Sequence, residues 1–435
     1  MTTAAGPTAS NPGRPDTFHM DVRFLGGARE VGRSAILIDD RLLLDYGQLT
    51  AEPPQFPVSE PDPDAVVVSH GHLDHVGAIP ALLKGSQRPP IHWTPPTGDL
   101  TRTLAQDTLK LHGTSPLCPF SEEHVHRLGE VEHRHGYRDP FTVCGGPDAG
   151  GYLVTLYNAG HIPGSAHVLV DDGDTRLLYT ADFHTDDQRL VSGTTARPDA
   201  DVVICESTYA DVRHDRREDV EQRWAESVRT ATWEGGTVVT PAFAIGRTQE
   251  MMLVAAAHDV SPYVDGMGVE VTRMVRQYPE FLRNPEALQN ATSNARFVNG
   301  RDGQRRRIAD GNEVIVTTSG MLAGGPAMTY IPAIRDQPTN RITLTGYQVD
   351  GTPGRQLLDT GRCELDGRVL PVAAKTELYD FSAHADRDGL ETFLAEYRDA
   401  ELLLNHGDSC VEFAAELREA GFDASAPELA TTVEV

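Results

Sequence analysis

Four potential metal ligands lie within six residues of this chain, in the segment HGHLDH at residues 70–75. The segment follows the apolar run 65–68, which predicts a short buried strand. Its first two histidines would point to the same side of an extended backbone, whereas Asp74 and His75 would lie in a turn into the next apolar segment. Imidazole and carboxylate are ligands that zinc prefers where an exchangeable water must remain. The pattern predicts two adjacent metal ions.

A simpler interpretation of this segment is that Asp74 caps a helix and the histidines are ordinary polar residues at a strand end. That interpretation would suffice for one histidine. It is disfavoured for a cluster in which every position is specified, because chance matches to short motifs become rare as more positions are fixed.

Other candidate site residues share one feature, which is that each comes just beyond the carboxyl end of a short apolar run. Strand ends converge to form sites in layered α/β folds, so we expect these side chains to approach the first cluster. They are Asp45, His161, Asp182 and His406.

The HxHxDH pattern at residues 70–75 resembles the signature of the metallo-β-lactamase superfamily. Further segments, taken in order, are similar to those of its β-CASP branch, the nucleases that include the cleavage subunit of the polyadenylation specificity factor and ribonuclease J. These segments are ESTY at 206–209, PAFAIGRTQE at 241–250, TSGMLAGGP at 318–326, TGYQVDGT at 345–352, FSAHAD at 381–386 and NHGD at 405–408.

The resemblance implies an α/β fold, a metallo-β-lactamase αββα sandwich with an inserted α/β β-CASP domain. We expect a disordered tail at residues 1–18 and the first part of the sandwich at 19–208. The β-CASP domain would follow at 209–375, and a return segment at 376–435 would complete the sandwich.

The resemblance also implies a role for each site residue. One metal ion would be bound by His70, His72 and His161, and the other by Asp74, His75 and His406. Asp182 would bridge the two ions, and Asp45 would support a ligand from behind. The ions would be zinc, with manganese as an alternative. Catalysis would involve Asp74, Asp182, Glu206 and His384, the last as a general acid that Glu206 orients.

The function expected from the resemblance is zinc-dependent hydrolysis of single-stranded RNA in RNA processing or decay, leaving a 5′-phosphate and a 3′-hydroxyl. Cutting could be internal, 5′→3′ exonucleolytic or both. The alternatives are a thioester or lactone hydrolase of the same superfamily and a catalytically silent RNA-processing partner. A homodimer and an RNA-processing or decay complex are further expectations.

The composition indicates the environment in which the protein works more than the reaction that it catalyses. The formal net charge is −26, and only three of the 38 basic residues are lysine. Such acidity usually argues against nucleic-acid binding, but it also suits a protein of a halophilic archaeon working in very high salt, which we favour. The five cysteines form no CxxC pair, and no apolar run is long enough for a membrane span. We expect a cytoplasmic protein.

Overall fold

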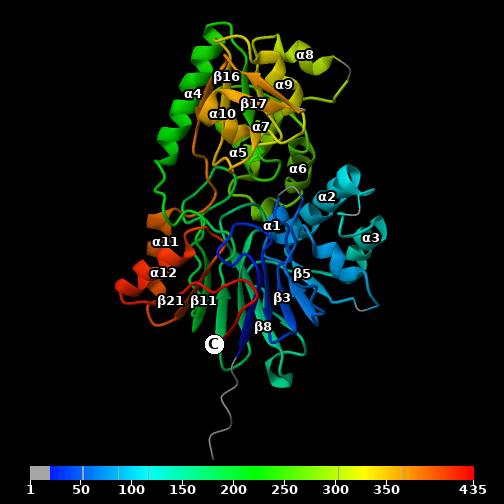
Figure 1. Cartoon of the computed structure of the whole chain (residues 1–435), viewed down its shortest axis with the longest axis vertical. Helices are drawn as coiled ribbons and strands as arrows, with labels where there is room; N and C mark the ends of the chain where they lie inside the picture. Colours follow the sequence, from blue (N-terminus) through cyan, green and yellow to red (C-terminus); the bar gives the residue numbers. More distant parts are fainter. Residues whose placement is uncertain (1–19, 51–52, 87, 116, 302, 366) are drawn as a thin grey trace, which may run out of the picture.

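The chain forms two lobes, one built around two facing sheets and the other around a third sheet (Figure 1). The computed structural model describes residues 20–50, 53–86, 88–115, 117–301, 303–365 and 367–435. The expected disordered tail at residues 1–18 lies outside the described residues. In Figure 1 the two facing sheets occupy the lower lobe, and the third sheet with its helices occupies the upper one.

The first sheet has seven strands in the order β22-β1-β2-β3-β4-β5-β6. Side chains alternate between its faces, as the pleat of a strand requires. In β2, Ile36 and Ile38 pack into the interior between the two sheets, whereas Leu37 packs on the outer face. The strands are β1 Asp21–Gly26, β2 Ala35–Ile38, β3 Leu42–Leu44, β4 Ala65–Val67, β5 Ile91–Trp93, β6 Glu132–Arg134 and β22 Thr432–Glu434.

The second sheet also has seven strands, in the order β21-β20-β11-β10-β9-β8-β7. The pairs β10 with β11 and β11 with β20 are parallel, so three carboxyl ends lie at the same edge. The strands are β7 Phe141–Val143, β8 Tyr152–Asn158, β9 Ala166–Asp171, β10 Arg176–Tyr179, β11 Val202–Glu206, β20 Glu401–Asn405 and β21 Asp423–Ser425.

Helices cover the outer face of each of these sheets. The short helices α1 (Leu73–Val76) and η1 (Ile79–Leu83), with α2 (Pro95–His112) and α3 (Glu122–Val131), pack on the first sheet. Helices α11 (Arg387–Leu394) and α12 (Cys410–Glu419) pack on the second, although they lie far beyond β11 in the sequence. The layers are therefore the predicted αββα sandwich.

The upper lobe contains six parallel strands in the order β14-β13-β15-β12-β16-β19. A hairpin, β17 with β18, lies beside them. The strands are β12 Val238–Pro241, β13 Tyr263–Asp265, β14 Arg296–Phe297, β15 Val314–Thr317, β16 Arg341–Leu344, β17 Arg362–Leu365, β18 Arg368–Pro371 and β19 Lys375–Leu378. The helices are α4 Arg217–Trp233, α5 Arg247–Ala257, α6 Gly268–Val275, α7 Pro285–Asn294, α8 Gln304–Ala309, α9 Ala327–Ile334 and α10 Pro353–Thr360. This lobe is the predicted α/β insertion.

Two expectations from composition concern the described residues. All five cysteines are free thiols, as their spacing predicted. Among the helices that the structure describes, none combines the length and apolar character needed to cross a membrane.

Candidate metal and catalytic centre

Four side chains from three strand ends form the first group of potential ligands. His70 and His72 follow β4, His161 follows β8, and Asp182 follows β10. One ligand atom of each lies within 4.8 Å of all the others. His161 Nε2 is 2.9 Å from His72 Nδ1, and His70 Nε2 is 3.5 Å from Asp182 Oδ2. Burial lowers the pKa values of His70 and His161 well below normal, which keeps both imidazoles neutral and able to bind metal.

The second group lies directly beside the first and contains Asp74, His75, Asp182 and His406, again within 4.8 Å of one another. His75 Nε2 and His406 Nδ1 are each 3.3 Å from Asp182 Oδ1. His406 Nε2 is 3.3 Å from Asp74 Oδ2. The structure therefore brings together all seven residues that the sequence proposed as ligands.

Asp182 belongs to both groups and divides its carboxylate between them. Oδ2 faces His70 and His161, whereas Oδ1 faces His75 and His406. Its side chain is only 2% exposed. A carboxylate placed in this way can bind one ion with each oxygen.

The donor set also fits a metal pair because several buried polar atoms have no hydrogen-bond partner among the described residues. These atoms are His70 Nε2, His406 Nε2 and Asp182 Oδ1. Charged neighbours lie near them, but without hydrogen-bond geometry. Because a buried polar atom without a partner costs free energy, these atoms are best explained as ligands of cations.

Asp45 anchors the ligand loop from behind, in the position expected for a supporting residue. Its carboxylate accepts hydrogen bonds from Ser69 N and Ser69 Oγ at 2.7 Å and from Tyr179 Oη at 3.0 Å, and it lies 2.7 Å from His75 Nδ1. This contact leaves His75 Nε2 to face Asp182. Burial opposes the charged form of His75, but Asp182 and Asp45 outweigh it and raise its pKa.

We expect Asp45→Asn to weaken metal binding about 10–100-fold, because the residue behind a ligating histidine fixes its orientation and basicity. The metal that each variant retains is measured in competition with a chelator of known affinity. Glu60→Gln, which removes one charge from an exposed side chain, is the control. Unchanged metal affinity in Asp45→Asn would contradict the supporting role.

Backbone contacts hold the loop at residues 70–75 against the residue before β2 and the segment after β3. Ser34 N donates to Asp74 O at 2.8 Å, and Tyr46 N donates to His75 O at 2.9 Å. A Cβ atom at Gly47 would lie 1.7 Å from Asp74 O, so only glycine permits this approach. The alternative role of Asp74 as a helix cap is wrong, since His72 is the N-cap of α1 and Asp74 lies within its first turn.

Glu206 and His384 form a pair at the edge of this centre. Glu206 ends β11 and is fully buried, and His384 lies in the segment between β19 and α11. His384 Nδ1 is 3.1 Å from each carboxylate oxygen of Glu206. Burial disfavours the imidazolium, but Glu206 and Asp182 outweigh it and raise the pKa of His384 to about 9. This shift favours the protonated imidazole, which is the form that a proton donor needs.

Several contacts of the centre were not identified from the sequence. His161 Nδ1 donates to Ala383 O at 2.8 Å, which links a potential ligand to the residue before His384. Thr208 Oγ1 lies 3.2 Å from His406 Nδ1, and its residue belongs to the ESTY segment. Such contacts depend on which loops meet in space, and sequence spacing alone does not predict that.

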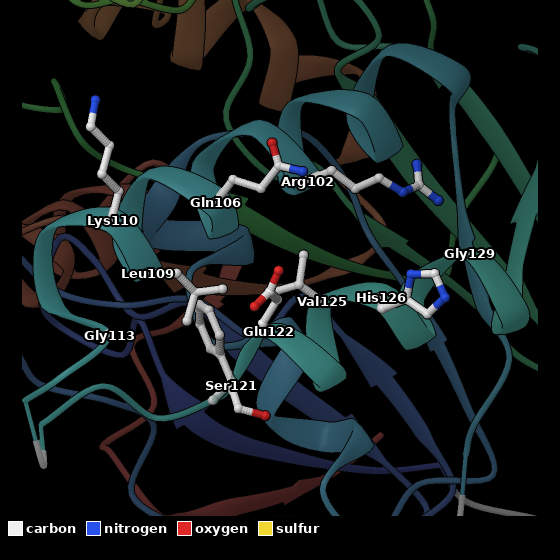
Figure 2. A pocket seen from close by; sticks show the side chains of 11 residues that line it. Arg102, Gln106, Leu109, Lys110, Gly113, Ser121, Glu122, Val125, His126 and Gly129 are labelled. Atoms are coloured by element: carbon white, nitrogen blue, oxygen red, sulfur yellow. The ribbon is translucent and has the colours of Figure 1, made fainter.

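A separate groove lies away from these residues. It is a groove of about 780 Å³ between α2 and α3, lined by residues such as Arg102, Lys110 and His126. Figure 2 shows Lys110 extending away from the other lining side chains. The groove contains none of the potential ligands.

Three family models match successive parts of the chain. The model of the metallo-beta-lactamase superfamily matches residues 29–215, and the Beta-Casp domain model matches residues 248–357. The model described as a Zn-dependent metallo-hydrolase RNA specificity domain matches residues 369–427. The first and third matches contain all seven potential ligands between them.

Similar proteins match most of this chain. RNase aCSPSF2 of Saccharolobus solfataricus is 36% identical over 89% of this chain and 79% of its own length. Probable RNase MJ4 of Methanocaldococcus jannaschii is 31% identical over 96% of this chain and 100% of its own. The transcription termination factor FttA of the same organism is 33% identical over 92% of this chain and 69% of its own length. A protein of unknown function from Enterococcus faecalis shares the fold, with a TM-score of 0.61 at 12% identity over 96% of this chain and 100% of its own.

Proposed function

Since the chain belongs to the Beta-Casp branch of the metallo-beta-lactamase superfamily, we propose that it is a zinc-dependent ribonuclease that hydrolyses phosphodiester bonds of single-stranded RNA. The observation that carries this proposal is the juxtaposition of two potential ligand groups, which share Asp182, with the Glu206–His384 pair. Relatives that cover most of this chain are named RNases, which supports the same substrate class.

We propose two zinc ions, with manganese as an alternative. His70, His72 and His161 would hold one, Asp74, His75 and His406 the other, and Asp182 both. Two ions held side by side would polarise the phosphoryl oxygens and lower the pKa of a water molecule so that it can attack phosphorus.

The residues of the chain supply the rest of the reaction. His384 would give its proton to the departing oxygen, which avoids the release of an unstable alkoxide. Glu206 keeps the imidazole oriented and protonated, because its carboxylate contacts Nδ1 and leaves Nε2 for the substrate. Glu206 is itself fixed, since its Oε1 accepts a hydrogen bond from Phe183 N at 2.8 Å.

We expect the purified protein, supplied with zinc or manganese, to cleave single-stranded RNA and to leave a 5′-phosphate and a 3′-hydroxyl. RNA labelled at either end, with 5′-triphosphate and 5′-monophosphate forms compared, reports the mode of cutting. Mononucleotides released only from the monophosphate form would indicate a 5′→3′ exonuclease, and discrete internal fragments an endonuclease. Failure to cleave RNA alongside hydrolysis of a thioester or lactone would refute the proposal.

A further inference from the structure

A second polar cluster lies beside His384, on the side of the upper lobe. Its main members are Arg247, which opens α5 after the carboxyl end of β12, and Arg217, which opens α4. Neither residue has a role in the chemistry described above. Both carry buried nitrogen atoms without hydrogen-bond partners among the described residues.

Arg247 lies against the loop that contains His161. A Cβ atom on Gly246, the residue before it, would be 2.8 Å from Ile162 Cγ2, and Gly246 adopts a φ of +77°. The unpartnered atoms of Arg247 are Nε and Nη1, two of the donors with which a guanidinium binds an anion. Burial, followed by the charge of Arg217, lowers the pKa of Arg247 to about 10. The two cations therefore act on each other without a carboxylate paired to either.

Arg217 is tied to the segment that carries His384. Its Nη2 donates to Ser382 O at 2.7 Å, and Ser382 Oγ accepts from His384 N at 3.1 Å. The Nη1 atom of Arg217 is buried and unpartnered within the described part of the chain. Nη2 of Arg217 thus has an acceptor in the protein, whereas Nη1 has none among the described residues.

Two histidines, His184 and His214, lie near the two arginines. The ring of Tyr209 lies 5.7 Å from that of His384 and 5.0 Å from that of His214, so the cluster continues outward from the proton donor. His214 Nε2 has no partner among the described residues, and neither has Nδ1 of His184, which is 7% exposed.

The carboxylates nearest to Arg247 are engaged elsewhere. Asp380 Oδ2 lies 2.6 Å from His214 Nδ1, and its Oδ1 accepts from Ser382 N at 3.0 Å. Glu250 accepts from Arg189 N and Leu190 N, at 3.0 and 2.8 Å. Among the described residues, no ion pair of Arg217 or Arg247 is present to offset the loss of hydration. Both side chains are half-buried, but a buried guanidinium nitrogen without an acceptor is costly, and an anion from outside the chain would supply the acceptor.

We infer that Arg217 and Arg247 bind the RNA phosphate that lies next to the scissile phosphate on its 5′ side. This inference rests on the proposed ribonuclease activity. If the products are a 5′-phosphate and a 3′-hydroxyl, His384 protonates the 3′ oxygen of the upstream nucleotide, which places that nucleotide and its own phosphate on the side of the arginines. A guanidinium matches the geometry of two phosphate oxygens. Local cations are also what a chain of net charge −26 needs to hold a polyanion.

Binding is measured with a fluorescent RNA oligonucleotide on the metal-loaded His384→Ala protein, which keeps the RNA intact. Arg247→Gln and Arg217→Gln are each expected to weaken binding about tenfold at low salt. Each is also expected to reduce the slope of log Kd against log salt by about 0.7, the value for one single-stranded phosphate contact. The double variant should lose no more slope than either single variant, because both arginines are needed to hold the one phosphate. Arg176→Gln, at the opposite end of β10, is the matched control.

A second measurement uses wild-type protein and therefore does not depend on the folding of a variant. RNAs that carry one uncharged methylphosphonate linkage are cleaved, and the linkage is moved along the strand. Cleavage should fall about tenfold when the linkage is immediately 5′ of the cut. Arg247→Gln should show no further loss at that position.

The outcomes separate the two proposals. If wild-type protein neither binds nor cleaves RNA, the proposed function fails. If it cleaves RNA but the slope and the methylphosphonate pattern are unchanged in Arg247→Gln, only the phosphate subsite is refuted. A structural role would instead lower the melting temperature of Arg247→Gln without RNA, whereas a binding role predicts an equal or higher one.

Discussion

Asp182→Ala is expected to abolish RNA cleavage, with a loss of about 10³-fold or more in kcat. Metal ions contribute several kcal/mol of transition-state stabilisation in such sites, and each 1.4 kcal/mol is about a factor of ten in rate. Asp182 is expected to have this effect because it belongs to both ligand groups and to the group formed with Glu206 and His384. Metal content, measured by mass spectrometry after dialysis, should fall together with activity.

Two comparisons make this experiment specific. Asp186→Ala changes an exposed carboxylate four residues along the same loop and should leave cleavage and metal content unchanged. His72→Ala removes a member of the first group only, so it should abolish cleavage while part of the metal remains bound. Circular dichroism and thermal melting report whether each variant is folded. Full activity in folded Asp182→Ala would contradict the metal assignment.

The position of the centre was predictable because each potential ligand follows an apolar run. The runs before Asp45, Asp182 and His406 are the strands β3, β10 and β20, as predicted. Strands of a layered fold end at common edges, so order along the chain indicated proximity in space. The resemblance supplied the pairing of Glu206 with His384, which are separated by 178 residues and could not be linked by spacing.

Other features depended on backbone conformation that the sequence does not display. Asp45, Ala181 and His406 all adopt positive φ angles, of 58°, 46° and 48°, directly after strands. For Ala181 this conformation costs about 1–2 kcal/mol relative to ordinary backbone, a strain that glycine would avoid. The structure shows that the turn which places Asp182 is strained here.

The arginine cluster escaped prediction for a different reason. In a sequence, the charge of Arg247 looks like that of any surface arginine. Its significance comes from burial without a partner, which depends on the packing of the two lobes against each other. Arg217 has no sequence signal at all, since it lies in the charged stretch at residues 211–219, most of whose other members are exposed.

His384→Ala is expected to lower kcat about 10²–10⁴-fold, the usual contribution of a positioned general acid, while metal content and KM stay near those of wild type. His126→Ala, on the exposed side of α3, is the control. An RNA analogue with a good leaving group, such as a nitrophenyl ester, needs less proton donation and should be much less affected. Loss of metal in His384→Ala would instead assign this histidine to the ligand set.

Glu206→Gln tests the same proton transfer through the pH dependence of kcat. A general acid must be protonated, so activity is retained below the pKa of His384 and lost as pH rises through it. Glu206 and Asp182 raise that pKa to about 9 against the effect of burial. Removing the charge of Glu206 lowers it, so the alkaline limb of log kcat should move to lower pH, and the loss of rate should be greater at pH 8 than at pH 6. Glu218→Gln, on the exposed face of α4, should leave the profile unchanged. Bound metal acts equally on His384 in wild-type protein and in the variants, so it does not account for a shift between them. A limb that stays in place in Glu206→Gln would show that another group donates the proton.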